Sequence, residues 1–182
     1  VFEIDEETFA DLDALLASRD EEAIGQRLRN LGVDVPPLID DTPIASPPLR
    51  ALSLAVAQKC NLGCTYCYAQ QGEFGGAAKN MPLEIALQSV DLLFRDVTPG
   101  ERVNLSFLGG EPLINRTVIR AATERATALA QERDARVTFS ITTNGTLLSE
   151  DDAAFFEQHG FAVTISIPGI REAHDAQRAF KG

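Results

Sequence analysis

Apolar residues in the region 50–167 follow two different periods, and their alternation predicts strands separated by helices. Compact apolar runs predict strands at residues 52–57, 103–108, 137–142 and 163–167. Apolar residues spaced three or four apart predict helices at 82–94 and 118–130 and after a capping Ser149. In the first helix, Leu83, Leu87, Val90 and Phe94 are expected on a common side. Strands joined by single helices predict an α/β domain with a parallel sheet and right-handed crossovers.

The first 33 residues have a different character. Phe9, Leu12, Leu15 and Leu16 recur at helical spacing, and residues 21–31 predict a second short helix that Gly32 ends. Residues 34–48 then carry five prolines, so we predict a small helical module at 1–33, a linker at 34–49 and the main domain at 50–182.

Charge is concentrated in this first part of the chain. Residues 1–41 hold twelve acids and three arginines, a balance of -9 out of a net charge of -11. The acids are either a solvated helix face or a surface that docks a basic partner. The net charge argues against a nucleic-acid partner, and no apolar run approaches the roughly 20 residues of a membrane span. Because the chain begins with Val1 and stops without a terminal element, we expect a fragment of something larger.

All three cysteines lie in one stretch directly after the first predicted strand. Cys60, Cys64 and Cys67 are spaced C-x3-C-x2-C, which is typical of a soft-metal site. A structural zinc site takes four ligands, and His159 and His174 lie about 90 residues downstream. A four-iron cluster can take three thiolates and leave one iron open. The alternatives are structural cysteines without metal, or a disulfide that leaves one thiol unpaired.

Other unusual residues also follow predicted strands. Gly109-Gly110-Glu111-Pro112 follows the second strand, the stretch 142–146 (Thr-Thr-Asn-Gly-Thr) the third, and 166–169 (Ser-Ile-Pro-Gly) the fourth. Ligands of parallel α/β folds bind at the carboxyl ends of the strands. The two glycines let a charged ligand approach the backbone, and Glu111 is an acceptor for an ammonium group. Each stretch is also compatible with an ordinary turn.

The cysteine stretch resembles the C-x3-C-x-aromatic-C signature of the radical S-adenosylmethionine (radical SAM) enzymes, with Tyr66 at the aromatic position. The resemblance covers residues 50–181 and implies an N-terminal part, about four βα units, of a (βα)6 TIM-like barrel. It also implies that the three cysteines hold a [4Fe-4S] cluster, and that S-adenosylmethionine chelates the fourth iron through its amino and carboxylate groups.

The same resemblance assigns further contacts to that cofactor. Residues 109–112 resemble the motif that binds its methionine amino group, and Thr143 and Asn144 are expected to line the pocket. Ser166 and Arg178 are similar to the contacts made with its ribose and carboxylate. The chain departs from the family at Pro168, because relatives usually read Ser-Ile-Asp-Gly-Pro there, and this places the contacts after the fourth strand in doubt.

Residues 67–69, 72–76 and 171–175 look most like thioether-forming peptide maturases of the SPASM type, which include the maturases of six-cysteine peptides and of quinohemoprotein amine dehydrogenase. The resemblance implies reductive cleavage to a 5′-deoxyadenosyl radical, hydrogen abstraction from a peptide and a sulfur–carbon cross-link. Auxiliary [4Fe-4S] clusters are expected only in a missing C-terminal region.

Residues 1–33 are similar to part of a leader-peptide recognition fold. The expected partners are a peptide or protein substrate and an electron donor such as flavodoxin or ferredoxin, in a reducing cytoplasm. The alternatives are sulfatase formylglycine maturation or small-molecule chemistry on the same barrel, and a non-catalytic metal- or peptide-binding module.

Overall fold

The computed structural model describes residues 4–33 and 48–181 of the 182-residue chain. The chain divides into two compact units, Val1–Ser46 and Pro47–Gly182, each of which is described by itself. Nearly all of the linker predicted at 34–49 lies outside the described residues. The predicted domain boundaries therefore remain a prediction.

Within residues 4–33, the first unit contains two helices, α1 (Glu6–Ser18) and α2 (Glu21–Asn30). Each begins at an aspartate whose side chain accepts a backbone N–H: Asp5 from Thr8 at 2.7 Å and Asp20 from Ala23 at 3.0 Å. An ion pair between Arg27 and Asp11 (2.6 Å) joins the two helices. Neither helix has a buried residue, as expected for helices too short to enclose a core.

The second unit is built on a five-stranded sheet of order β2-β1-β3-β4-β5. Four strands are parallel: β1 (Ala51–Gln58), β3 (Arg102–Gly109), β4 (Arg136–Thr143) and β5 (Phe161–Ile165). They neighbour one another in chain order, which is the winding of a (βα) barrel rather than of a doubly wound sheet. The α/β class is thus confirmed.

The structure adds an antiparallel strand at one edge of the predicted parallel sheet. Strand β2 (Lys79–Asn80) pairs antiparallel with the end of β1, with Ala57 opposite Asn80. This strand consists of two exposed polar residues, which show no hydrophobic periodicity, so the sequence pattern could not predict it.

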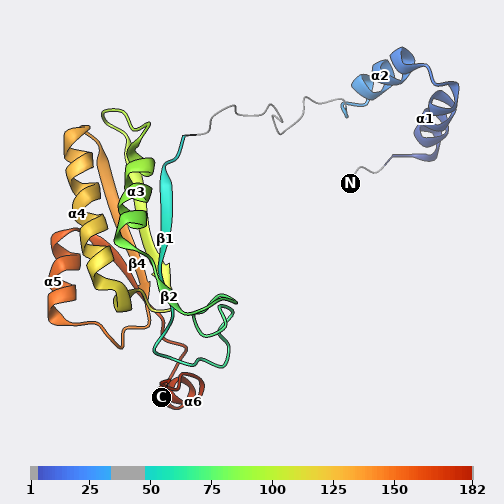
Figure 1. The fold of residues 1–182 in the computed structure, drawn as a ribbon. Coiled ribbons are helices and arrows are strands. Elements are labelled where there is room, and N and C mark those ends of the chain that lie inside the picture. The colour runs from blue at the N-terminus through green and yellow to red at the C-terminus, as the bar shows by residue number, and fades with distance from the viewer. Residues whose placement is uncertain (1–3, 34–47, 182) are drawn as a thin grey trace. The chain divides into compact units, whose positions relative to one another are not determined.

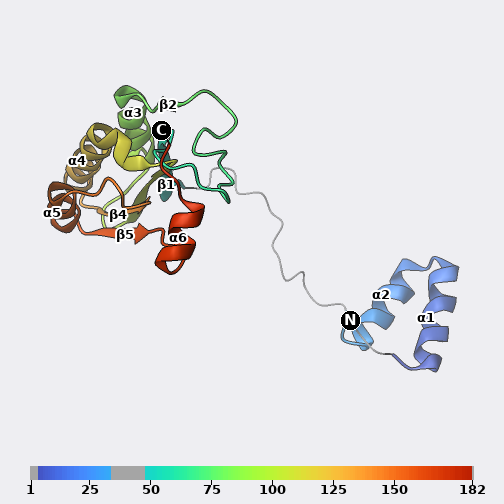
Figure 2. The same ribbon diagram turned by 90° about the horizontal axis from the view of Figure 1, so that it is seen from below.

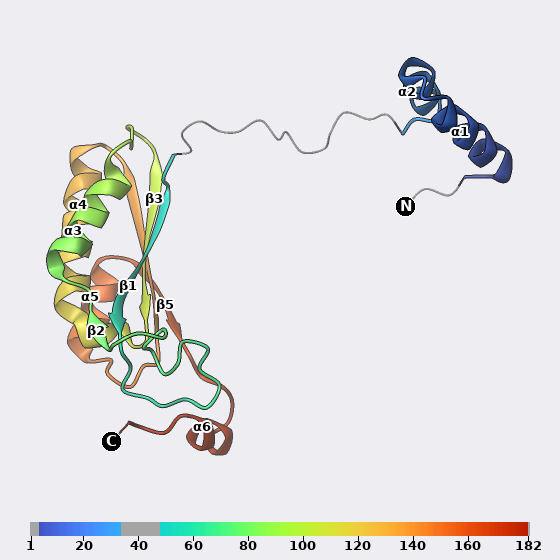
Figure 3. The ribbon, with the colours of Figure 1, turned by 45° about the vertical axis from the view of Figure 1, so that its right-hand side comes forward.

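Three helices cover one face of the sheet: α3 (Leu83–Phe94), α4 (Arg116–Glu132) and α5 (Glu150–Gln158) (Figures 1 and 3). Between them and the sheet lies a core that includes Val56, Leu105, Phe107 and Ile141. Val90 and Phe94 of α3 face this core as expected, but Leu83 is 42% exposed and Ala86 and Leu93 are buried instead. The buried stripe is therefore rotated relative to the one predicted. Within the described residues, none of the helices combines the length and hydropathy that crossing a membrane requires.

The fourth predicted strand is displaced. It was expected at 163–167, whereas β5 runs over Phe161–Ile165. Gly160, with φ of 63°, makes the turn just before it, and Phe161 stacks on Phe139 with ring centroids 5.1 Å apart. Pro168 has no N–H for the ladder, which favours the early end. Ser166 therefore lies just beyond the strand, although its N–H still donates to the Thr143 carbonyl at 3.0 Å.

The opposite face of the sheet carries hydrogen-bonded polar side chains in the middle of β3 and β4. The hydroxyls of Ser106 and Ser140, which are register partners, lie 2.7 Å apart, and the Asn104 amide donates to the Thr138 hydroxyl at 3.0 Å. Strands β3 and β4 thus alternate an apolar side toward the helices with a hydrogen-bonded polar side.

Candidate functional site

The site lies at the carboxyl edge of the parallel strands. Because β1, β3, β4 and β5 run in the same direction, the segments that follow them meet at one end of the sheet. Figures 2 and 3 show the loop after β1 and helix α6 (Arg171–Gln177) at this end. The sequence stretches singled out above therefore come together in space.

The three cysteines line one pocket of about 320 Å³. Cys60, Cys64 and Cys67 are all free thiols of intermediate exposure. In the part of the chain that the structure describes, no three His, Cys, Asp or Glu side chains converge tightly enough to hold a single metal ion. A [4Fe-4S] cluster requires a different arrangement, since each thiolate binds its own iron and the sulfurs surround a volume.

The electrostatics at Cys60 oppose a free thiolate. Burial raises the pKa of the Cys60 thiol, and the charge of Glu111 adds to this rise. Hydrogen bonds to the sulfur from the Leu62 N–H (3.4 Å) and the Asn144 side-chain amide (3.7 Å) work in the other direction. A positively charged metal centre is what would stabilise the deprotonated sulfur here.

The cysteine loop is held from outside by the segment 177–181. The N–H groups of Gly63 and Thr65 donate to the carbonyls of Ala179 (2.7 Å) and Gln177 (3.0 Å), and the Lys181 N–H donates to Asn61 (3.0 Å). Backbone groups that would otherwise be unpaired in a long loop are satisfied in this way. We call residues 177–181 the strap.

The Gly-Gly pair is the place where three chain segments cross. A Cβ on Gly109 would lie 2.4 Å from the Ala57 carbonyl oxygen, and one on Gly110 would lie 2.4 Å from that of Lys59. Gly109 also has φ of 150°, which few residues other than glycine adopt. These two glycines are therefore needed for the packing of β3 against the strand end that leads into Cys60.

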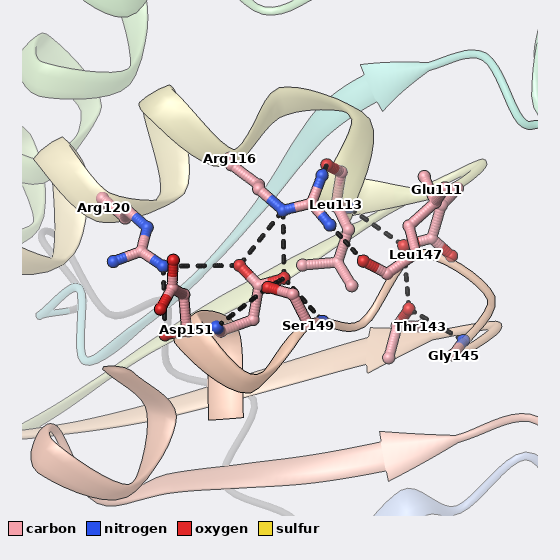
Figure 4. Close-up of polar contacts among 10 residues, drawn as sticks. Glu111, Leu113, Arg116, Arg120, Thr143, Gly145, Leu147, Ser149 and Asp151 are labelled. Atoms are coloured by element: carbon pink, nitrogen blue, oxygen red, sulfur yellow. Dashed lines mark hydrogen bonds and ion pairs between the residues drawn. The ribbon is translucent and has the colours of Figure 1, made fainter. Parts of the chain in front are cut away.

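Glu111 is fully buried, with 0% exposure, and is not among the residues that line the pocket. Its carboxylate accepts hydrogen bonds from the Leu113 N–H (2.9 Å), the Thr143 hydroxyl (2.8 Å) and the Asn144 N–H (2.8 Å). Figure 4 shows the Glu111 and Thr143 side chains pointing toward each other. The carboxylate thus connects the end of β3 to the end of β4.

Some of the other predicted site residues line the pocket, and others are buried beside it. With the cysteines, the pocket is lined by Tyr66, Gly109, Gly110, Thr143, Asn144, Ser166 and Arg178. Pro112, like Glu111, lies outside this lining and is buried as the first residue of the short helix η1 (Pro112–Asn115). The structure therefore brings together residues separated by more than a hundred positions in the sequence.

Arg178 has an unusual position in this pocket. It is only 6% exposed, and one terminal nitrogen donates to the Ser166 carbonyl. Its Nε is buried and has no hydrogen-bond partner among the described residues. A buried guanidinium nitrogen without an acceptor is costly, so the arrangement favours an anionic ligand at this position.

Sequence reasoning missed several supporting residues. Asn61 donates to the Thr146 hydroxyl at 2.8 Å, and Lys181 reaches the Gln71 carbonyl at 2.9 Å. Gly72, with φ of 92°, packs its Cα against Gly110 and Cys60. A glycine inside the cysteine-rich loop was the one available signal, whereas contacts of the strap depend on tertiary structure alone.

An α/β domain with three thiols at the carboxyl ends of its strands, beside an arginine whose Nε has no partner among the described residues, has the features of a cofactor-dependent enzyme domain. Comparison with known proteins specifies the class. Residues 54–182 match the radical SAM superfamily, and the chain belongs to it.

Curated relatives lie in several branches of that superfamily. The chain is 30% identical over 136 residues to the cysteine-type anaerobic sulfatase-maturating enzyme of Clostridium novyi, covering 71% of this chain and 36% of that protein. It is 29% identical over 173 residues to the Fe-coproporphyrin III synthase of Methanosarcina barkeri, covering 93% and 37%.

Solved structures agree with these relatives. Native anSMEcpe with bound AdoMet has a TM-score of 0.59 and 26% identity, covering 73% of this chain and 36% of that one. Native anSMEcpe with AdoMet and the Cp18Cys peptide has a TM-score of 0.58 and 27% identity, covering 74% and 35%. The chain thus spans well under half the length of these relatives.

Membership confirms the predicted cofactors. Radical SAM enzymes use a [4Fe-4S] cluster and S-adenosylmethionine (AdoMet), and the structural neighbours hold AdoMet. The homology extends to the anaerobic sulfatase-maturating enzymes rather than singling out thioether-forming ones.

Proposed function

We propose that this chain is the cluster- and AdoMet-binding part of a radical SAM enzyme that modifies a peptide or protein. The observation that carries the proposal is one pocket lined both by three free thiols and by Arg178, whose Nε has no partner among the described residues. Peptide-bound neighbours and sulfatase-maturating relatives support a peptide as the substrate.

The donor set suits the two cofactors. Cys60, Cys64 and Cys67 supply three thiolates, which leaves one iron of a [4Fe-4S] cluster free for a further ligand. Arg178, held by the Ser166 carbonyl, supplies a guanidinium for the carboxylate of AdoMet. Thr143, Asn144 and Ser166 line the space between them, and Tyr66 belongs to the same lining.

When bound, the reduced cluster and AdoMet supply a carbon-centred oxidant, formed by one-electron cleavage of the sulfonium, that removes a hydrogen atom from the substrate. The chain's own contribution is to orient the cofactors and to exclude water. The strap and the Gly-Gly crossing fix the cysteine loop, and Glu111 fixes the turn that carries Asn144.

For the bond formed, we propose a sulfur–carbon thioether cross-link in a cysteine-containing peptide. The stretches 67–69, 72–76 and 171–175 support this choice by their resemblance to thioether-forming maturases. Formylglycine formation is the second candidate, which the sulfatase-maturating relatives favour.

We further propose that residues 1–33 dock the leader of the peptide substrate. The observations behind this are the acidic composition and the exposed apolar side chains of Phe9 and Leu16 on α1. A cytoplasmic location and an electron donor of the flavodoxin or ferredoxin kind complete the proposal.

Anaerobic reconstitution of the full-length protein tests the enzyme class. Iron, acid-labile sulfide and 5′-deoxyadenosine release are measured for wild type and for single Cys→Ala variants at the three positions. We expect each variant to lose the cluster and the release of 5′-deoxyadenosine. A zinc centre without AdoMet turnover would support a metal-binding module and contradict the enzyme proposal.

Mass spectrometry of the product separates the two bonds. Cysteine-containing peptides, with and without a leader and including one from a sulfatase, are incubated with the reconstituted enzyme. A product that retains sulfur, has lost a pair of hydrogen atoms and no longer reacts with thiol reagents supports the cross-link. Loss of sulfur with gain of an aldehyde would show formylglycine formation and refute the thioether.

A further inference from the structure

The buried carboxylate of Glu111 is committed to the chain itself. Three of its roughly four acceptor positions are taken by the Leu113 N–H, the Thr143 hydroxyl and the Asn144 N–H, at 2.8–2.9 Å. Bonds to an ionised carboxylate are about twice as strong as neutral ones, so this is a firm junction between β3 and β4. Its Oε2 holds the backbone of Asn144 directly.

The side chain of Asn144 is equally committed, and its orientation follows from its partners. Its Oδ1 accepts from the N–H and the hydroxyl of Thr146, at 2.9 and 2.6 Å. Both partners are donors there, so the opposite end of the amide must be the NH2 group. That group donates to the Asn61 Oδ1 at 3.0 Å and to the Cys60 sulfur at 3.7 Å.

Cys60 therefore receives two N–H···S bonds, from the Asn144 amide and from the Leu62 backbone (3.4 Å). No such bond to Cys64 or Cys67 is found among the described residues. Donors directed at a ligating sulfur draw electron density from it and favour the more negative, reduced state of an iron–sulfur cluster.

We propose that Glu111 is a positioning residue that directs the Asn144 amide at the Cys60 sulfur, and that this bond raises the reduction potential of the cluster. The inference rests on the proposed function, since it takes Cys60 to be a cluster ligand. It gives Glu111 a role distinct from contact with an ammonium group, because that carboxylate acts through Asn144 and lies outside the pocket lining.

The test is the midpoint potential of the reconstituted full-length protein, measured by anaerobic redox titration followed by electron paramagnetic resonance. In Asn144→Ala, we expect iron content to be retained and reduction to become roughly three- to tenfold less favourable. At 59 mV per tenfold for one electron, this is a shift of roughly 30–60 mV to more negative potential. Thr164→Val is the matched control, because Thr164 lies on the neighbouring strand β5, outside the pocket lining, and its side chain has no hydrogen bond to another described residue.

Glu111→Asp keeps the negative charge near Cys60, but its shorter side chain no longer holds the Asn144 turn firmly, so it should shift the potential in the same direction. If Glu111 acts through Asn144, the double variant has the potential of Asn144→Ala alone. Additive shifts would contradict the positioning role.

Three further outcomes are informative. An Asn144→Ala protein with full iron content and the potential of wild type would overturn the proposal. If that variant loads no cluster, Asn144→Ser is used, because its hydroxyl preserves a turn acceptor but is too short to reach Cys60. Loss of iron in both would make Asn144 an assembly residue and overturn the proposal as well. A wild-type protein that binds no cluster would instead refute the proposed function.

Discussion

Replacing Gly110 with alanine tests whether the Gly-Gly pair serves chain packing. The added Cβ would lie 2.4 Å from the Lys59 carbonyl oxygen, 2.6 Å from its carbon and 2.8 Å from the Cα of Gly72. Real Cβ atoms are almost never closer than 3.0 Å to such neighbours, and all three are backbone atoms. Neither neighbouring segment can yield by rotating a side chain.

The structure indicates the size of the effect. Ordinary contact would require the Lys59 carbonyl to move by about 1 Å, from 2.4 to 3.4 Å, and this would displace Cys60, the next residue. Overpacking typically costs 1–3 kcal/mol, and the rigid surroundings favour the upper end, about 3 kcal/mol. At roughly 2–4 °C per kcal/mol, the melting temperature should fall by about 6–12 °C.

Gly76→Ala is the matched control. Gly76 lies in the same region, has no positive φ, and its nearest potential neighbour is an oxygen at 3.7 Å. Thermal unfolding and iron content after anaerobic reconstitution are compared for the two variants and wild type. We expect Gly110→Ala to melt lower and to load less iron, while Gly76→Ala matches wild type. Equal melting temperatures and iron contents for the two variants would refute the steric argument.

Three further predictions address other contacts. Asp152 is 2% exposed and accepts hydrogen bonds from Ser149 and Arg116. Burial works to raise its pKa, but these hydrogen bonds outweigh it and the pKa is lowered. Its contribution is therefore present above the unfolded value of 3.8 and lost as pH falls through the lowered pKa. Asp152→Asn should cost about 2 kcal/mol at pH 7, with the difference from wild type closing at acid pH in denaturant titrations; a pH-independent difference would contradict this. Arg178→Gln should weaken AdoMet binding about tenfold or more in equilibrium titration with iron content intact, and unchanged affinity would contradict its assignment to the carboxylate. Lys181→Pro removes the N–H that donates to the Asn61 carbonyl, whereas Lys181→Ala keeps it. In the cluster-free protein, the cysteines should therefore be alkylated faster in Lys181→Pro than in Lys181→Ala. Equal alkylation rates would contradict the role of the strap in holding the cysteine loop.

Local hydrophobic patterns predicted much of the fold, because the residues that form the apolar core recur with the period of the strand or helix that contains them. The runs that predict β1, β3 and β4 are buried on the helix side, and Ser149 caps α5 as its position suggests. The pattern did not predict strand β2, because two residues are too short to show a period. It misplaced the bounds of β5, because Gly160 and the stacking of Phe161 on Phe139 determine where that strand begins.

The sequence by itself predicted the kind of chemistry at the cysteine loop, because ligand type and spacing are local properties that need no neighbour. Glu111 shows what it did not determine. A carboxylate after a Gly-Gly turn has the same chemical character whether it faces a ligand or the chain, and only the juxtaposition of β3 and β4 made it an internal junction. The strap and the unpartnered Nε of Arg178 are likewise products of the tertiary structure, because contacts between residues about 110 positions apart leave no periodic trace.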